Sequence, residues 1–337
     1  MERILSIDTV RVIAITAVIA IHTYPFGSGI ASEQNTSMYI AILINQLSRF
    51  AVPFFFIISG YFWGIKTRKS LNPLDISSPM TKRLLLLFVC WSFVYLLPYS
   101  STSLWLESTY QKITFFIQHP IKLLFEGTKD HLWFLMALIC AVAICAIFIQ
   151  FKKTKLLFYT ALLLYFIGVL AGAYSQTPIG IELNFNTRNG PFFGTLLFFT
   201  GYYLSGLAVS KKWFLYGLIC FSLGTLVHFA EVVFLWKYYQ TTLVQDFVFG
   251  TYFMGLGISL VALSNQPFLQ SKRLSEIGKL TLGIYAIHYV FVDLFSARVK
   301  TFHSPLMDII FLLVVALLSL FVTWLFSKNK YLKKVVM

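Results

Sequence analysis

The sequence predicts an all-α polytopic membrane protein, with about ten transmembrane helices in one bundle. Of its 337 residues, 58% are hydrophobic and only 12% are charged, and the mean hydropathy is +0.76. Soluble globular domains carry about twice that share of charged residues. Apolar runs of about twenty residues, long enough for a helix to cross a bilayer, recur along the chain. We therefore expect residues 1–337 to form a single integral-membrane domain.

Ten apolar segments are candidate spans, each of about the length that a crossing helix needs. They cover residues 8–25, 38–64, 80–99, 131–150, 155–173, 190–208, 213–231, 243–263, 278–296 and 305–326. The second is unusually long. The seventh and eighth carry Glu231 and Asp246 at their outer margins, which weakens both predictions.

The loops between the spans differ in charge. With ten spans both termini share a side, and the loops and ends on that side hold 18 of the 27 Lys and Arg residues. The opposite loops hold 7, and Arg11 and Arg49 lie within spans. By the positive-inside rule both termini are expected in the cytoplasm. This distribution accounts for the net charge of +14, so the bilayer is the expected partner and nucleic acid is not.

The first span has a polar face. It reads DTVRVIAITAVIAIH, and Arg11 and His22 are eleven positions apart, close to three helical turns. On a helix they share one face, separated by roughly 16 Å at ~1.5 Å per residue. Placing ionisable side chains inside the bilayer costs free energy, so two of them on one face of a membrane helix suggest a functional polar path. The alternative is that Asp8 and Arg11 form an interfacial i,i+3 pair, with His22 among the opposite headgroups.

Three further ionisable groups lie in or at the edge of spans. Arg49 is about eleven residues into the second span, where a guanidinium needs a carboxylate, carbonyl groups or an anionic ligand. His131 begins the fourth span and His288 lies midway through the ninth. A histidine at an interface is also compatible with a simple hydrated anchor.

Two outer loops have compositions that suggest a role beyond connecting spans. Residues 109–125, TYQKITFFIQHPIKLLF, are predicted to form an interfacial helix. Residues 174–190, YSQTPIGIELNFNTRNG, are polar and interrupted by Gly and Pro. This loop either contacts a polar ligand outside the membrane or serves only as a connection.

Five segments, in order along the chain, resemble one protein family. They are SIDTVRVIAITAVIAIH at 6–22, SRFAVPFFFIISGYFW at 48–63, HLWFL at 131–135, TRNGPFFGTLLFFTGYYL at 187–204 and TLGIYAIHYV at 281–290. Together they resemble the family-three integral-membrane acyltransferases, which include bacterial O-acetyltransferases of surface glycans. The resemblance covers essentially all ten spans.

The resemblance implies transfer of an acyl group, usually acetyl, from cytoplasmic acyl-CoA to a hydroxyl of an extracytoplasmic acceptor. The donor substrate would be acetyl-CoA, the acceptor a surface glycan or lipid-linked saccharide, the location the bacterial inner membrane, and no metal is expected. His22 is the expected general base or, as a variant, an acyl carrier. The other expected catalytic residues are Arg11, Arg49, His131 and His288, with support from Asp8, Ser59, Trp133, Arg188 and Asn189. The rival reading is a transporter or exporter without catalysis, and oligomeric state is left open.

The expected donor site departs from the family pattern. Many members begin the third span with two arginines three positions apart; here TKRLLLLF places Arg83 at the first position and Leu86 at the second. Contact with CoA is therefore assigned to Arg83 together with Lys82 and Arg68. Simpler roles remain for several predicted residues: Lys82 and Arg83 as stop-transfer charges, Ser59 with Gly60 as a packing contact, and Trp133 as an aromatic-belt residue. Asp293 and Glu33 are candidates for orienting His22.

Overall fold

The computed structural model describes residues 4–27, 36–97, 99, 105–302 and 304–336, and these form helices and no strand. The α-helices are α1 (Leu5–Thr23), α2 (Thr36–Leu47), α3 (Ala51–Thr67), α4 (Pro73–Leu96), α5 (Trp105–Gln118), α6 (Pro120–Glu126), α7 (Trp133–Gln150), α8 (Thr154–Leu170), α9 (Pro191–Leu204), α10 (Trp213–Tyr239), α11 (Phe249–Leu263), α12 (Lys272–Gly278), α13 (Thr281–Lys300) and α14 (Pro305–Lys328). Short 3-10 turns are η1 (Ser48–Phe50), η2 (Asp130–Leu132), η3 (Pro267–Leu269) and η4 (Leu332–Val335).

The helices agree with an all-α membrane bundle. Within the described residues, 7 helices are long and apolar enough to cross a membrane: Leu5–Thr23, Thr36–Thr67, Pro73–Leu96, Asp130–Gln150, Trp213–Tyr239, Thr281–Val299 and Pro305–Lys328. The predicted spans at 155–173, 190–208 and 243–263 fall on the shorter helices α8, α9 and α11. Polytopic membrane architecture is thus confirmed.

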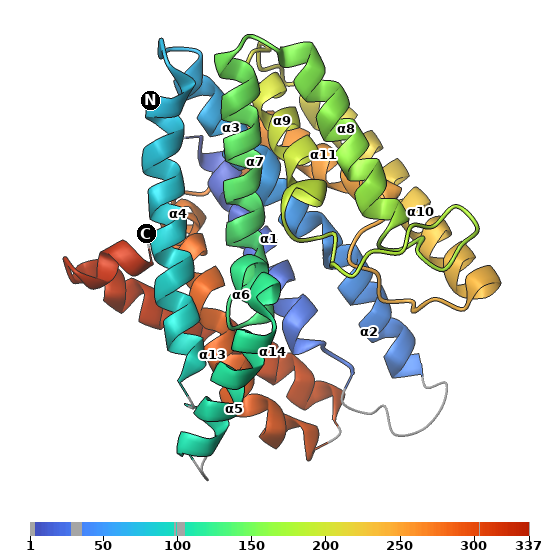
Figure 1. Ribbon diagram of the computed structural model, residues 1–337, viewed down its shortest axis with the longest axis vertical. Coiled ribbons are helices and arrows are strands. Elements are labelled where there is room, and N and C mark those ends of the chain that lie inside the picture. The colour runs from blue at the N-terminus through green and yellow to red at the C-terminus, as the bar shows by residue number, and fades with distance from the viewer. Residues whose placement is uncertain (1–3, 28–35, 98, 100–104, 303, 337) are drawn as a thin grey trace.

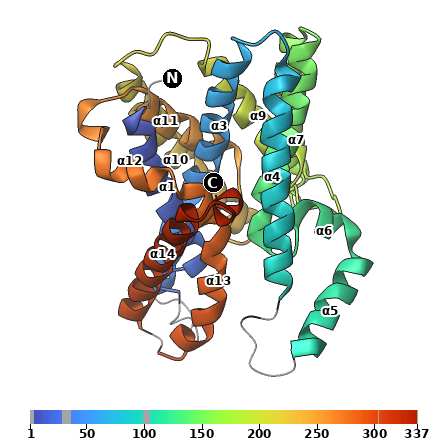
Figure 2. The same ribbon diagram turned by 90° about the vertical axis from the view of Figure 1, so that its left-hand side faces the viewer.

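Two ends of the bundle can be distinguished (Figures 1 and 2). The turns between α3 and α4 and between α7 and α8 lie at one end, at the top of both views. The helices α13, α14 and α5 lie toward the other end, with α5 at the edge of the molecule.

The second predicted span is not one regular helix. The 3-10 turn η1 divides it into α2 and α3, and Arg49 is the middle residue of that turn. A 3-10 turn within a long helix is frequently found at functional positions because it re-aims the side chains it carries. The break places Arg49 at the junction of α2 and α3.

A close crossing of α3 and α9 forms the centre of the bundle. A Cβ at Gly60 would lie 2.0 Å from the Phe198 carbonyl oxygen, and one at Gly201 would lie 1.9 Å from the Ile57 carbonyl oxygen. Small residues allow membrane helices to approach this closely. Gly60 therefore has the packing role expected of it. Its neighbour Ser59 lines a cavity, described below.

The predicted interfacial helix forms as two helices. A single helix does not run through residues 109–125 because the chain breaks at His119, and Pro120 starts α6 at a position where its missing N–H costs nothing. Large apolar side chains on both helices are exposed, including Ile117, Ile121 and Leu124. Exposure of that kind fits helices that lie against lipid.

Candidate active site

Three histidines from distant parts of the chain meet inside the bundle. His22 ends α1, His131 lies in η2 and His288 lies in α13. Their ring centroids are 6.5 Å apart for His22 and His131, 5.3 Å for His22 and His288, and 5.1 Å for His131 and His288. The Tyr289 ring packs 4.7 Å from His22 and 4.8 Å from His131. We call His22, His131, His288 and Tyr289 the histidine cluster.

The three imidazoles differ in environment. His131 is 2% exposed and His288 is fully buried, whereas His22 retains partial exposure. His288 Nδ1 lies 2.7 Å from the Tyr285 carbonyl oxygen, which requires that nitrogen to carry the proton. Its Nε2 and the Nδ1 of His131 have no hydrogen-bond partner within the described part of the chain. Of the three, His22 is therefore the imidazole most open to a reactant.

Arg49 and Arg188 share a carboxylate that the sequence analysis did not assign. Arg49 donates to Asp246 at 2.9 Å, and Arg188 donates to the same carboxylate at 3.2 Å. The side chains are 12%, 21% and 36% exposed for Arg49, Arg188 and Asp246. We call these three residues the arginine clamp. The carboxylate needed by Arg49 comes from the loop before α11, and the presence of Asp246 at a span margin was the signal for it.

The arginine clamp controls the charge state of its own carboxyl group. Burial raises the pKa of Asp246, but the Arg188 and Arg49 guanidinium groups lower it by more, so the pKa lies below its ordinary value. Asp246 is therefore ionised at neutral pH and holds both guanidinium groups in place.

A chain of amides connects the arginine clamp to α1 and α10. Asn45 accepts hydrogen bonds from Arg49 at 3.0 and 3.2 Å and donates to the Ile21 carbonyl, next to His22, at 3.4 Å. Gln46 donates to Asn45 at 3.0 Å and lies 3.0 Å from the buried His228 ring. Because these groups are buried and mutually bonded, the network fixes Arg49 relative to the helix that carries His22.

The second feature of the site is a cavity of about 650 Å³ between α1, α3, α4, α7 and α13. Four basic side chains line it: Arg11, Lys66, Arg83 and Lys279. We call it the basic cavity. Its remaining walls are mainly apolar, including Val18, Phe55, Phe134 and Leu138, and they also contain Ser59. It thus combines a cationic region with a long apolar wall.

The basic cavity reaches the histidine cluster through Tyr285. This residue lines the cavity, and its ring lies 5.4 Å from His131 and 6.2 Å from His288. Its hydroxyl donates to the His131 carbonyl oxygen. A molecule occupying the cavity would therefore end one aromatic ring away from the histidine cluster.

Not all predicted donor residues lie at this cavity. Arg83 lines it, but Lys82 does not, and Arg68 instead donates to Ser205 Oγ at 3.2 Å and to the Tyr202 carbonyl at 3.1 Å. Arg68 also stacks on the Tyr202 ring at 4.4 Å, so it ties α3 to the end of α9. The additional charge at the cavity comes from Arg11, Lys66 and Lys279.

Arg11 occupies the basic cavity while bonded to Asp8. The two side chains are 3.0 Å apart, and Asp8 also accepts from Ser275 Oγ at 3.0 Å. The expected i,i+3 pair therefore forms, and α12 contributes to it. Asp8 therefore holds Arg11 in place, and Arg11 also lines the basic cavity.

The candidates for orienting His22 are placed elsewhere. Asp293 bonds to Lys129 at 2.7 Å and accepts from Tyr99 at 2.6 Å. Lys129 lies over the Tyr289 ring at 4.6 Å, so this ion pair borders the histidine cluster without being bonded to His22. Glu33 lies outside the described residues.

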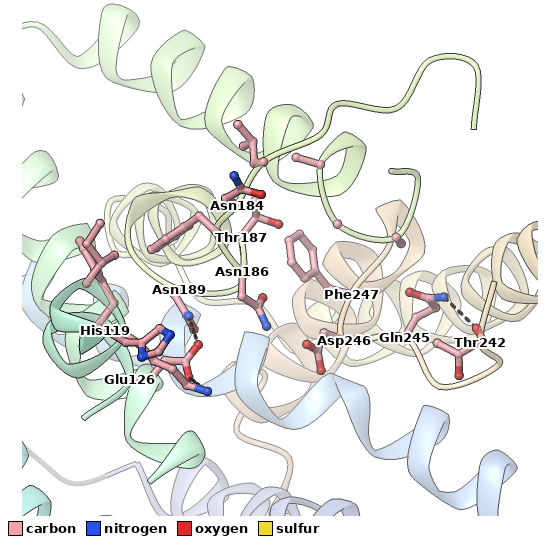
Figure 3. Close-up of a pocket in the computed structure, with 18 of the residues that line it drawn as sticks. His119, Glu126, Asn184, Asn186, Thr187, Asn189, Thr242, Gln245, Asp246 and Phe247 are labelled. Atoms are coloured by element: carbon pink, nitrogen blue, oxygen red, sulfur yellow. Dashed lines mark hydrogen bonds and ion pairs between the residues drawn. The ribbon is translucent and has the colours of Figure 1, made fainter. Parts of the chain in front are cut away.

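A third feature lies beside the arginine clamp. A cleft of about 940 Å³ is lined by α6, by the loop after α8 and by the loop before α11 (Figure 3). The two loops contribute the polar residues Asn184, Asn186, Asn189, Gln245 and Asp246 to its lining. We call it the amide cleft. Asn189 donates to Glu126 at 2.7 Å, so this predicted support residue fixes α6 against the TRNG segment. The neighbouring Arg188 lies 5.6 Å from the ring of Trp133, the first residue of α7, so this end of α7 contacts the clamp.

The comparisons with known proteins identify the family. A family model described as "Acyltransferase domain" matches residues 4–328. The chain belongs to acyltransferase family three. This family-three acyltransferase therefore carries its histidine cluster, arginine clamp and both cavities within the region that defines the family.

Two curated relatives show where such a domain also occurs. Both are described as "Amino-acid racemase" from Enterococcus faecalis. One is 31% identical over 242 residues, covering 66% of this chain and 32% of the relative; the other is 28% identical over 335 residues, covering 92% and 44%. The family-three acyltransferase thus spans less than half of the length of these relatives. No solved structure matches.

Proposed function

We propose that this family-three acyltransferase is an O-acetyltransferase that moves an acetyl group from cytoplasmic acetyl-CoA to a hydroxyl of a cell-surface glycan. The observation that carries the proposal is the basic cavity. It is lined by four cationic side chains and by Tyr285, whose ring contacts His131 of the histidine cluster. Family membership supports acyl transfer in general. The donor, the acceptor and the residue roles below are parts of the proposal.

The donor fits the basic cavity by charge and by length. Phosphate groups of CoA would lie near Arg83, Lys66 and Lys279, since Lys and Arg bind phosphate oxygens by charge and hydrogen bonding. The thin pantetheine arm would follow the apolar wall past Phe55 and Leu138. The roughly 16 Å between Arg11 and His22 along α1 provides the length scale for that path.

In the proposed reaction, His22 and the arginine clamp act on the two substrates. The neutral His22 imidazole takes the proton of the acceptor hydroxyl, and the hydroxyl oxygen attacks the thioester carbon. The tetrahedral oxyanion is stabilised by Arg49 or Arg188, which the arginine clamp holds ready before the reaction. The C–S bond then breaks, and the CoA thiolate receives the proton. In the variant with an acyl-histidine, His22 attacks the thioester carbon, the C–S bond breaks, and the CoA thiolate leaves with the imidazole proton. The acceptor hydroxyl then takes the acetyl group from His22 and returns its proton to the imidazole.

Orientation in the membrane completes the proposal. The Lys and Arg excess supports an orientation in which both termini, and with them the basic cavity, lie on the cytoplasmic side of the bacterial inner membrane. The amide cleft then faces the extracytoplasmic side. The histidine cluster lies between the two openings, where donor and acceptor meet.

Removal of the base is the direct test. We expect purified His22→Ala in proteoliposomes to lose transfer of labelled acetyl from acetyl-CoA by roughly hundredfold or more, the usual contribution of a general base. Gln176→Ala, an exposed change in the loop at 171–190, is the control. If folded His22→Ala transfers acetyl at the wild-type rate, the assignment of His22 as the general base is wrong. A chain that binds acetyl-CoA but never transfers acetyl would instead favour the transporter or exporter.

A matched pair of substitutions tests the donor path. Arg83 lines the basic cavity and Lys82 does not, although they are adjacent in α4. We expect Arg83→Ala to raise the KM for acetyl-CoA about tenfold, since it removes a hydrogen bond to a charged group. Lys82→Ala should change it less than about twofold. Equal effects would place the CoA phosphates outside the cavity.

A further inference from the structure

The amide cleft has the properties of a built binding site. Its volume of about 940 Å³ lies at the upper end of the range of ligand-binding pockets. Figure 3 shows Asn186, Asn189 and Asp246 turned toward the space between α6 and the loop before α11. Phe185 and Phe247 add aromatic surface to the same walls. Amide and carboxylate groups together with aromatic faces suit a ligand with many hydroxyl groups and apolar C–H faces.

The charges in the amide cleft disfavour an anionic ligand. Among its lining residues the one Lys or Arg is Lys122, which lies 3.8 Å from Glu126, and the carboxylates are Glu126 and Asp246. Arg49 and Arg188 bond to Asp246 but do not line the cleft. An acidic polymer in the cleft would meet two carboxylates and one lysine that is already paired. The ligand chemistry that fits is therefore an uncharged saccharide.

The position of the amide cleft limits how such a saccharide can arrive. Three helices end beside the cleft: α8 ends at Leu170, α9 begins at Pro191 and α11 begins at Phe249. Ends of membrane helices mark the level of the headgroups. A ligand in the cleft would therefore lie at the membrane surface, not far above it.

The amide cleft also carries exposed apolar side chains. Ile121 lines the cleft and is 62% exposed, and its neighbours Ile117 and Leu124 are 73% and 53% exposed. Leu183, in the loop after α8, lines the cleft as well and is 43% exposed. Exposed apolar side chains around a polar cleft are unfavourable in water but favourable beside acyl chains. The cleft thus offers polar contacts inside and apolar contacts at its rim.

We propose that the amide cleft is the acceptor site and that it binds an uncharged saccharide attached to a membrane lipid, whose tail leaves past α5 and α6. This inference rests on the proposed function. It goes beyond it by placing the acceptor and by choosing a lipid-anchored saccharide over a free polymer. Asp246 forms part of the cleft and of the arginine clamp, so the bound saccharide lies directly against the groups that stabilise the oxyanion.

Photo-cross-linking tests the site without any chemistry at His22. The full chain in lipid nanodiscs is exposed to dodecyl glycosides that carry a diazirine on the alkyl carbon nearest the sugar, with glucose, galactose or N-acetylglucosamine as the head. We expect cross-links in residues 117–126 and 183–189. The unmodified dodecyl glycoside should suppress them, and the methyl glycoside of the same sugar at equal concentration should not.

Paired variants test the polar contacts. Gln118 and Asn184 are exposed and line the amide cleft, whereas Gln111 and Gln176 are exposed and do not. We expect the double variant Gln118→Ala with Asn184→Ala to lower the cross-linking yield about tenfold through two lost hydrogen bonds. The double variant Gln111→Ala with Gln176→Ala should leave the yield unchanged.

The outcomes separate the two proposals. No cross-links with any head, cross-links outside the cleft, or equal competition by the methyl glycoside would overturn the inference. Acetyl transfer to a soluble glycoside together with any of these results would leave the proposed function intact. Cross-links in the cleft with no acetyl transfer to any acceptor would support the site and refute the acetyltransferase.

Discussion

At the scale of single residues, two guanidinium groups share one carboxylate. Arg49 comes from the turn between α2 and α3, Arg188 from the loop before α9, and Asp246 from the loop before α11. Removing one partner of a partly buried ion pair leaves the other charge poorly satisfied and is unfavourable. Asp246 is therefore the residue on which the geometry of the arginine clamp depends.

Asp246→Asn removes the charge and keeps the size of the side chain. We expect it to lower the free energy of unfolding by about 2 kcal/mol, the cost of donors left poorly satisfied. We also expect it to slow acetyl transfer about tenfold, because the oxyanion donors lose their fixed positions. Asp246→Glu should recover part of both losses. Glu182→Gln, an exposed change nearby, is the control; a rate equal to wild type in Asp246→Asn would exclude a role for the clamp in the reaction.

The lowered pKa of Asp246 predicts the pH dependence of this stabilisation. A carboxyl group whose pKa is lowered by folding stabilises the folded state fully above its unfolded pKa, about 3.9 for Asp. That stabilisation is lost as the pH falls through the lower folded pKa. The difference in thermal stability between wild type and Asp246→Asn should therefore be constant from pH 7 to about 5 and shrink below about 4. A difference that grows on acidification would contradict the assignment.

At the scale of helices, the crossing of α3 and α9 places the cavities. The helices contact each other through backbone at Gly60 and Gly201, so neither position has room for a side chain. The same α3 carries Ser59, Phe62 and Lys66 along the wall of the basic cavity. A change in the crossing would therefore alter the path to the histidine cluster as well as the packing.

Gly60→Ala should test this crossing. The added Cβ meets backbone, which cannot yield, and we expect a loss of about 2 kcal/mol in the free energy of unfolding, in the range for overpacked cores. Gly168→Ala in α8 is the matched control, because its Cβ would meet only the Phe192 and Phe247 side chains, at 3.1 and 3.2 Å. Thermal unfolding in detergent measures the stability of both variants. Equal melting temperatures for the two variants would show that α3 and α9 can separate without cost.

At the scale of the whole molecule, a cavity and a cleft lie on two sides of one polar centre. The basic cavity meets the histidine cluster at Tyr285, and the amide cleft meets the arginine clamp at Asp246. A donor and an acceptor can therefore reach the centre without sharing an entrance. This arrangement suits a reaction whose two substrates come from different sides of a membrane.

Cysteine labelling tests the orientation that the proposal requires. Lys153 lies between α7 and α8, and Asn184 lies in the loop that lines the amide cleft. In intact spheroplasts we expect a membrane-impermeant maleimide to label Asn184→Cys and to reach Lys153→Cys only after lysis. Cys220 and the other native cysteines in the parent chain set the background. The opposite labelling pattern would reverse the membrane orientation.

Much of the fold was predictable because hydropathy and turn chemistry act locally. The apolar runs located the helices, and the Gly and Pro residues of the 174–190 loop indicated an irregular connection. The 3-10 turn at Arg49 was not predicted, since residues 38–64 are apolar on both sides of it. The helix expected at 109–125 is divided at His119 because Pro120 begins a new helix. The sequence pattern predicted one continuous helix there.

The sequence by itself determined the membrane class, the family resemblance and the five segments that carry the candidate residues, because these depend on composition and on short motifs. Only the tertiary structure brought His22, His131 and His288 together, paired Arg49 with Asp246, and placed Arg83, rather than Lys82 or Arg68, at the basic cavity. The physical reason is distance along the chain. Contacts between residues more than a hundred positions apart depend on how whole helices pack, and no local pattern of apolar and charged residues contains that information.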